Sequence, residues 1–285
     1  MNTRTTAGAL LAALMLVSVA AAPAVPALAA QEPEIPWTPG PTTGRLGDEA
    51  AINVPSSCLF TGTNGVELFM EMTENPVGGN ERGVVLCPIR EDAWFVVFSF
   101  EESGYVRDDE GGSLDAEDIL STIRRSTNEA NKERRRRGWG SLTIEDWVTA
   151  PHYDSATNNL TWALTARTDS GERSVNHSVR LLGRTGVMHV DLVSSPELLD
   201  QLIPTFNTML AGFEYQSGYR YAEWREGDKV AAYGLTALVA GGAGAVLAKS
   251  GLLARFWKLI VAGVLALLAA MKGLWRKVAG GSSSA

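Results

Sequence analysis

Every acidic residue of this 285-residue chain lies between Glu32 and Asp228, and an apolar segment carrying only positive charge stands on each side of that interval. This charge distribution constrains the fold, because an acidic, water-soluble domain must form between two segments whose composition suits a membrane. The interval holds 17 basic residues, from Arg45 to Arg225, against 32 acidic ones, a net charge of −15. Such a domain repels nucleic acid and anionic lipid headgroups at long range, so we expect neither as a primary ligand.

The N-terminal segment has the features of a secretory signal. Arg4 is its only charged side chain, an apolar run extends from Ala7 to Ala22, and the small-residue sequence Ala27-Leu28-Ala29 follows. This pattern predicts a signal peptide over residues 1–29 that is removed on export. Residues 30–228 are then expected to form one extracytoplasmic domain, long enough for a substantial core.

The C-terminal segment predicts a membrane anchor. Val230–Ala248 is uncharged over 19 positions, which is about 28 Å of helix and close to the hydrocarbon thickness. We therefore expect a transmembrane helix at residues 230–254, and its Gly-rich run Gly241–Ala245 allows close approach of a second helix. For the basic residues 255–285 two interpretations stay open, an amphipathic helix at the inner membrane surface or a second membrane helix. The first predicts a single-pass protein of the cell membrane with a cytoplasmic C-terminus.

Cys58 and Cys87 are the only cysteines of the chain, and both fall in the expected extracytoplasmic domain. Because export places them in an oxidising compartment, the pair predicts a disulfide that stabilises the domain by about 3 kcal/mol. Two unpaired buried thiols are the alternative interpretation. Two isolated cysteines without neighbouring histidines are a poor metal site, and the sequence predicts neither a metal nor a cofactor.

Hydrophobic patterns predict an α+β domain with an antiparallel sheet and two flanking helices. Strands are expected at Val84–Ile89 and Ala93–Val106, followed by a helix capped by Ser113 and stopped by Gly138. The remaining expected elements are four strands and a closing helix, at Leu142–Ala150, Leu160–Arg167, Val175–Leu182, Val187–Val193 and Pro196–Leu210.

The prolines and one hairpin turn add detail to this predicted secondary structure. Residues 30–57 are rich in Pro, Gly and Thr and are expected to run extended, with Trp37 and Leu46 as anchors. Pro151 is expected to separate two strands. If the last hairpin turns at 183–186, its register places His177 and His189 on opposite faces of the sheet.

Motifs that carry chemistry are scarce. The sequence has no G-x-S-x-G elbow, P-loop, H-E-x-x-H or Gly-rich dinucleotide turn. The acidic stretch 107–118 does not fit an EF-hand loop, because its first position would be Val106 or Arg107. Arg134–Arg137 beside Trp139 suggests an anion-binding patch, but consecutive helical cations point in different directions, which favours a solvated helix end. The domain also carries tryptophans that suit either packing or a ligand groove, namely Trp94, Trp139, Trp147, Trp162 and Trp224.

Six segments carry a resemblance to a known family. They are IPWTPGPTTGRLGDEA, WFVVFSFEESGYVRDDE, EANKERRRRGW, PHYDSATNNLTWA, RLLGRTGVM and KVAAYGLTALVAGGAGA. Over about Ile35–Ala248 the chain resembles a bacterial family of predicted membrane-anchored proteins classed as a domain of unknown function. The resemblance implies an exported, membrane-bound protein and brings no catalytic residues. In element order alone, the domain is similar to the Mog1/PsbP-like α+β sandwich, which implies a fold and no function.

Three hypotheses of function follow. Export, the tether and the scarcity of catalytic motifs favour a membrane-anchored module that binds or senses a partner at the bacterial envelope. The alternative is an envelope enzyme with a dispersed carboxylate site, for which Glu101, Glu102, Asp108 and Asp109 are the acids to test. The third is a structural subunit that self-associates through the Gly-rich span. The expected partners are the lipid bilayer and either an envelope protein or a second copy of the chain.

Overall fold

The computed structural model describes residues 34–89, 92–111 and 114–241. Internal contacts separate the chain before Ile35, and the unit that begins there carries the fold. The signal peptide expected at residues 1–29 and the tail expected at residues 255–285 lie outside the described residues, and both stay predictions.

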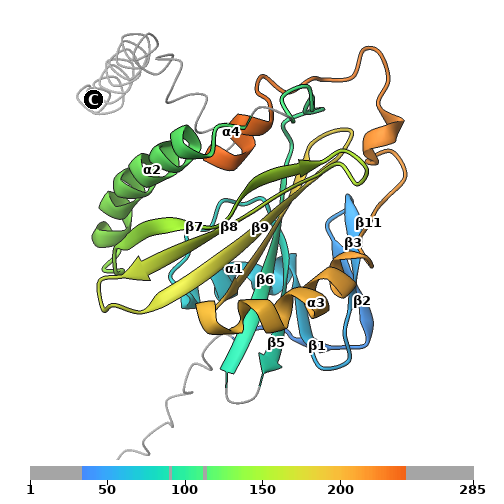
Figure 1. Cartoon of the computed structure of the whole chain (residues 1–285). Coiled ribbons are helices and arrows are strands. Elements are labelled where there is room, and N and C mark those ends of the chain that lie inside the picture. The colour runs from blue at the N-terminus through green and yellow to red at the C-terminus, as the bar shows by residue number, and fades with distance from the viewer. Residues whose placement is uncertain (1–33, 90–91, 112–113, 242–285) are drawn as a thin grey trace, which may run out of the picture. The chain divides into compact units, whose positions relative to one another are not determined.

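An eight-stranded antiparallel sheet forms the centre of the fold (Figure 1). Its order is β1-β4-β5-β6-β10-β9-β8-β7, with the bounds β1 Thr38–Pro39, β4 Leu59–Gly62, β5 Glu81–Ile89, β6 Asp92–Glu101, β7 Leu142–Asp154, β8 Asn159–Thr168, β9 Arg173–Leu182 and β10 Val187–Ser194. A smaller sheet, of order β11-β3-β2, joins β2 Thr42–Leu46, β3 Ala50–Val54 and β11 Glu214–Tyr215. The expected α+β class with an antiparallel sheet is confirmed.

Helices cover both faces of the main sheet. They are α1 Thr63–Met72, α2 Ala116–Arg136, α3 Leu199–Leu210 and α4 Leu235–Ala240, with 3-10 turns at Pro196–Leu198 and Tyr221–Glu223. On one face, α3 and the smaller sheet bury Phe206 together with Phe98 and Met188. On the other face, α1 packs on β4 and β5, while α2 and α4 pack at the β7–β8 end around Trp162. The two expected flanking helices, α2 and α3, are present, whereas α1 was not predicted and α4 lies within the helix expected at residues 230–254.

The last hairpin has the predicted register. Leu182 pairs with Val187, and His189 pairs with Arg180. His177 lies against Phe206 of α3, with ring centroids 5.4 Å apart, so His189 projects from the opposite face. The prediction that the two histidines lie on opposite faces is confirmed.

The local sequence determines where α2 begins and ends. Asp115 caps the helix, because its carboxylate accepts hydrogen bonds from the backbone N–H groups of Glu117 and Asp118, both at 3.0 Å. The expected cap, Ser113, lies outside the described residues. Gly138 ends the helix with φ of +77°, a left-handed conformation that glycine adopts without strain, as predicted.

Two strand boundaries differ from the prediction. The strand expected to reach Val106 ends at Glu101, because the next donors turn away from the sheet and the Tyr105 N–H bonds to the Lys229 carbonyl at 2.8 Å. Pro151, expected to separate two strands, lies inside β7. β7 is an edge strand whose pairing shifts around this position, and such a strand tolerates a residue without an N–H donor.

The Pro-rich segment at residues 30–57 contains more structure than an extended run. It forms β1 and the β2–β3 hairpin. Leu46 is fully buried and anchors it, as predicted, and Ile52 and Val54 of β3 enter the same core. Short strands with small apolar residues give a weak sequence signal, which explains why the hairpin was not predicted.

The beginning of the span expected at Val230–Ala248 packs against the domain. Leu235 and Leu238 of the six-residue α4 are 0% and 1% exposed, in a cluster with residues of α2 and the main sheet. Among the residues that the structure describes, no helix is both long and apolar enough to cross a membrane. The remainder of the expected transmembrane helix, residues 242–254, lies outside the described residues.

Candidate functional site

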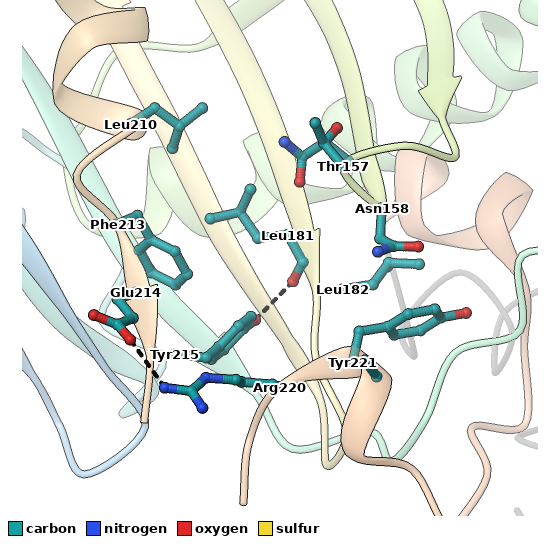
Figure 2. A pocket seen from close by; sticks show the side chains of 12 residues that line it. Thr157, Asn158, Leu181, Leu182, Leu210, Phe213, Glu214, Tyr215, Arg220 and Tyr221 are labelled. Atoms are coloured by element: carbon teal, nitrogen blue, oxygen red, sulfur yellow. Dashed lines mark hydrogen bonds and ion pairs between the residues drawn. The ribbon is translucent and has the colours of Figure 1, made fainter. Parts of the chain in front are cut away.

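A groove of about 370 Å³ opens where β9 ends and β8 begins (Figure 2). Four separate stretches line it: the turn before β8, the end of β9, the end of α3 with β11, and the 3-10 turn at Tyr221. The lining residues are Thr157, Asn158, Asn159, Leu181, Leu182, Leu210, Phe213, Glu214, Tyr215, Arg220, Tyr221 and Ala222. Its volume falls at the low end of the range for small-ligand sites, roughly 300–1,000 Å³.

The floor of the groove is apolar and held by a buried tyrosine. The Tyr215 hydroxyl donates to the Leu181 carbonyl at 2.7 Å and accepts the Met188 N–H at 2.9 Å. Burial raises the pKa of Tyr215, so the hydroxyl stays neutral. Phe213 packs edge-on against the Tyr215 ring with centroids 5.0 Å apart. The Tyr215 and Phe213 rings are therefore held in fixed positions beside the groove, whereas Leu181 and Leu182 send their buried side chains into the cores on opposite faces of the sheet.

The rim of the groove is polar. Asn158 has φ of +54°, a left-handed conformation that asparagine tolerates better than most residues, and its carbonyl accepts the Leu182 N–H at 3.2 Å. On the opposite side, Arg220 donates to Glu214 at 2.9 Å and keeps half of its side chain exposed. The rim thus offers amide and guanidinium groups above an apolar floor.

An ion pair fixes the segment that closes the groove. Arg184, in the β9–β10 turn, donates to both carboxylate oxygens of Asp228, at 2.7 and 2.8 Å. The hydrogen bonds from Arg184 and from the backbone N–H of Arg225 lower the pKa of Asp228 to about 2. The Arg184 N–H also bonds to the Tyr219 carbonyl at 2.8 Å. The groove is therefore built into the resting fold.

A second polar feature lies on the main sheet, on the face that α1 and α2 share. Arg180 donates to Asp191 at 3.0 Å and stacks on the Trp162 ring at 4.7 Å. Nε2 of His189 lies 3.1 Å from the Glu101 carboxylate, which also accepts the Tyr233 hydroxyl. These side chains come from β6, β8, β9, β10 and the segment before α4.

The protonation of this cluster follows from burial and charge pairing. Burial lowers the pKa of His189, and the positive charge of Arg180 lowers it further. Burial alone would raise the pKa of Asp191, but the charge of Arg180 and the hydrogen bonds from Ser178 and Arg180 outweigh it and the pKa is lowered. The cluster therefore holds a charged Arg180–Asp191 pair beside a neutral imidazole.

The four acids proposed for a dispersed catalytic site have separate surroundings. Glu101 belongs to the cluster with His189, and Asp108 accepts the Tyr153 hydroxyl at 2.7 Å. Glu102 and Asp109 are exposed. Among the described residues, no group of three or more His, Cys, Asp or Glu side chains is placed to hold a metal ion.

The basic helix end is occupied by local contacts. Arg134 and Arg137 both lie over the Trp139 ring, at 5.7 and 5.0 Å. Arg134 also donates to the Glu74 carbonyl at 2.8 Å, and Arg137 pairs with Glu133 at 3.0 Å. These contacts agree with the interpretation as a helix end and leave no converging anion site in this part of the structure.

The cysteine pair is placed for bonding. The Cys58 and Cys87 sulfur atoms are 1.97 Å apart and their Cα atoms 4.3 Å, a geometry compatible with the expected disulfide. Both residues are buried in the core under α3. Their oxidation in the exported protein stays a prediction.

The fold and the groove define an α+β domain with an antiparallel sheet and a ligand-sized site at one end. The family described as "Protein of unknown function (DUF2167)" matches residues 38–272, most of the chain. The chain belongs to this family, and the resemblance found in the sequence is confirmed.

Two solved structures are similar to this chain at low sequence identity. The solution structure of cyanobacterial PsbP from Synechocystis sp. PCC 6803 is 14% identical, with a TM-score of 0.36 over 61% of this chain and 90% of that one. The crystal structure of a protein of unknown function from Pseudomonas aeruginosa is 12% identical, with a TM-score of 0.23 over 59% and 92% of the two chains. No curated protein sequence matches this chain.

The sequence did not reveal the groove. Its lining is contributed by four stretches between Thr157 and Ala222, and none of them carries a motif. The Asn158-Asn159 pair was identified only as a turn. The asparagine pair before β8 was the one local signal, and it does not distinguish a turn from a binding rim.

Proposed function

We propose that this protein is an exported, membrane-anchored module that binds a partner at the bacterial envelope, and that the groove of Figure 2 is its binding site. The observation that carries the proposal is the groove itself, with a rigid apolar floor beneath a rim of amide and guanidinium groups. Such a surface suits recognition, since its one ion pair, Glu214–Arg220, is already satisfied.

The chemistry of the groove favours a polypeptide partner. The half-buried side chains of Leu210 and Phe213 suit an apolar side chain, whereas Thr157 and Asn158 at the rim offer donors and acceptors for peptide groups. We propose that an envelope protein inserts a short segment here.

The sequences of the two chain ends support the proposed location at the envelope. The signal pattern at residues 1–29 supports export, and the apolar, basic sequence after Gly241 supports a tether in the cell membrane. Because α4 is packed into the core, we propose that the membrane segment begins after Gly241, later than the sequence alone suggests. The order of a strand pair, a long helix, four antiparallel strands and a closing helix supports a Mog1/PsbP-like sandwich for the exported domain.

Filling the groove tests the proposal. Ala222 is an exposed lining residue, and Ala211 is an exposed residue outside the groove, so Ala222→Trp and Ala211→Trp form a matched pair. We expect a protein that co-purifies from solubilised membranes with the wild type and with Ala211→Trp to be lost with Ala222→Trp. Equal recovery with all three would reject the groove as the site, and turnover abolished by Glu101→Gln would favour the enzyme alternative.

A further inference from the structure

The segment between α3 and α4 exposes apolar side chains at one end of the domain. The exposed large hydrophobic residues of the described chain are Met72, Val148, Trp224 and Val230. Two of these four, Trp224 at 38% and Val230 at 37%, fall within seven positions of each other. In Figure 1 this segment is the orange ribbon that leads into α4. Exposed apolar residues gathered in this way indicate a contact surface.

Aromatic stacking fixes the position of the exposed indole. Tyr105 and Tyr221 stack with ring centroids 4.4 Å apart, and Tyr105 lies 5.2 Å from the Trp224 ring. The Tyr221 hydroxyl donates to the Val106 carbonyl at 3.1 Å. The three rings therefore form one preorganised surface, here called the aromatic patch.

Backbone pairing ties Val230 to the aromatic patch. The Tyr105 N–H donates to the Lys229 carbonyl at 2.8 Å, and the Ala231 N–H donates to the Tyr105 carbonyl at 2.9 Å. Val230, between these two bonds, therefore projects its exposed side chain from a fixed backbone. A hollow of about 440 Å³ adjoins it, lined by residues of the 107–110 loop and of 230–234.

The charge around the aromatic patch differs from that of the domain. Its exposed charged neighbours in sequence are Arg107, Arg220, Arg225 and Lys229 on the basic side and Glu102, Asp109 and Glu226 on the acidic side, a balance of +1 among exposed side chains. The domain interval as a whole carries −15. The exposed side chains at this end thus do not add to the repulsion between the acidic domain and a lipid surface.

The position of the aromatic patch in the chain points to the same partner. From Val230 the chain enters α4, about 9 Å long for six residues, and then reaches Gly241, where the apolar, basic tail sequence begins. Tryptophan and tyrosine rings with flanking lysine or arginine are typical of the membrane–water interface.

We propose that the end of the domain formed by the aromatic patch and Val230 rests on the outer surface of the bilayer that holds the tail. This inference depends on the membrane anchoring in the proposed function and adds which surface of the domain faces the lipid. Tyr221 also lines the groove of Figure 2, so the contact places the groove next to the membrane surface.

A site-specific fluorophore in the full-length chain tests this orientation. Val230→Cys and Val148→Cys each give one exposed site for an environment-sensitive dye, and Val148 on β7 is the matched control. The dye is attached to unreduced protein. Its fluorescence is then measured in vesicles of a zwitterionic lipid, with and without a spin-labelled lipid that quenches fluorescence near the headgroups. We expect a blue-shifted, quenched emission at position 230, no quenching at position 148, and loss of the quenching when Trp224→Ala is added to the Val230→Cys chain.

The outcomes separate this inference from the proposal on which it rests. A chain that floats with the vesicles, but shows equal emission and quenching at positions 230 and 148, would overturn the orientation and leave the anchoring intact. A chain that does not float with the vesicles would overturn both. Quenching at position 230 only in vesicles that contain anionic lipid would also contradict the inference, because the contact is attributed to aromatic and apolar side chains and not to basic ones.

Discussion

Replacing Leu238 by alanine should destabilise the exported domain strongly, although Leu238 lies in a segment whose sequence resembles a membrane span. The side chain is 1% exposed and belongs to the cluster that includes Ile119 and Trp162. A Leu→Ala change at a buried site costs about 2–5 kcal/mol, since both apolar burial and packing contacts are lost. The domain as a whole is stable by about 5–15 kcal/mol, so the loss is a large fraction of the total.

Urea unfolding of a chain truncated after Gly241 measures this effect. With a slope of about 2–3 kcal/mol per molar, a loss of about 3 kcal/mol lowers the midpoint by about 1 M. Val148→Ala is the control, because Val148 is 50% exposed and surface changes stay within about 0.5 kcal/mol. If Leu238→Ala shifts the midpoint no more than Val148→Ala, then α4 does not belong to the domain core and the span begins near Val230.

Three further predictions follow from buried groups. Replacing both Cys58 and Cys87 by alanine removes a link across 29 positions and should lower the free energy of unfolding by about 3.6 kcal/mol; equal urea midpoints for the exported wild type with and without reductant would show that the bond does not form. Burial lowers the pKa of His177 and of His189. The unfolded chain therefore binds protons first below about pH 6.5, and the free energy of unfolding should fall by up to about 1.4 kcal/mol per pH unit for each histidine. A urea midpoint that stays constant from about pH 7 to about pH 5 would contradict this sign. Asp191→Asn leaves the Arg180 guanidinium without its charged partner in a part-buried pair and should lower the free energy of unfolding by about 1–3 kcal/mol; a variant that unfolds at the same temperature as the wild type would show that the pair does not stabilise the domain.

The sequence predicted those parts of the fold that local periodicity and turn chemistry determine. The helix from Ala116 to Arg136 has charges that match its dipole and a glycine at its end. The register of β9 and β10 follows from one four-residue turn. Such features need no knowledge of distant residues, and they were confirmed.

The remaining parts depend on contacts between distant segments. In the sequence alone, Leu235 and Leu238 resemble the start of a membrane span. Only the three-dimensional structure shows that they pack with residues of α2. Pro151 is compatible with a strand only because β7 lies at the sheet edge. The groove likewise requires the β8 turn and Arg220, more than 60 positions apart, to face one another. Periodicity carries no information on such pairings, so they could not be predicted.

The central claim is that the groove binds a partner in the native envelope, and in-cell hydroxyl-radical footprinting tests it directly. Phe213 lines the groove and is not part of the aromatic patch, whereas Met72 on α1 is 68% exposed and lies outside the groove. Oxidation of each residue is compared between intact cells and the purified full-length protein. The account predicts that Phe213 is protected in cells while Met72 is oxidised equally in both samples. Equal oxidation of Phe213 in cells and in purified protein would contradict the claim that the groove is a binding site.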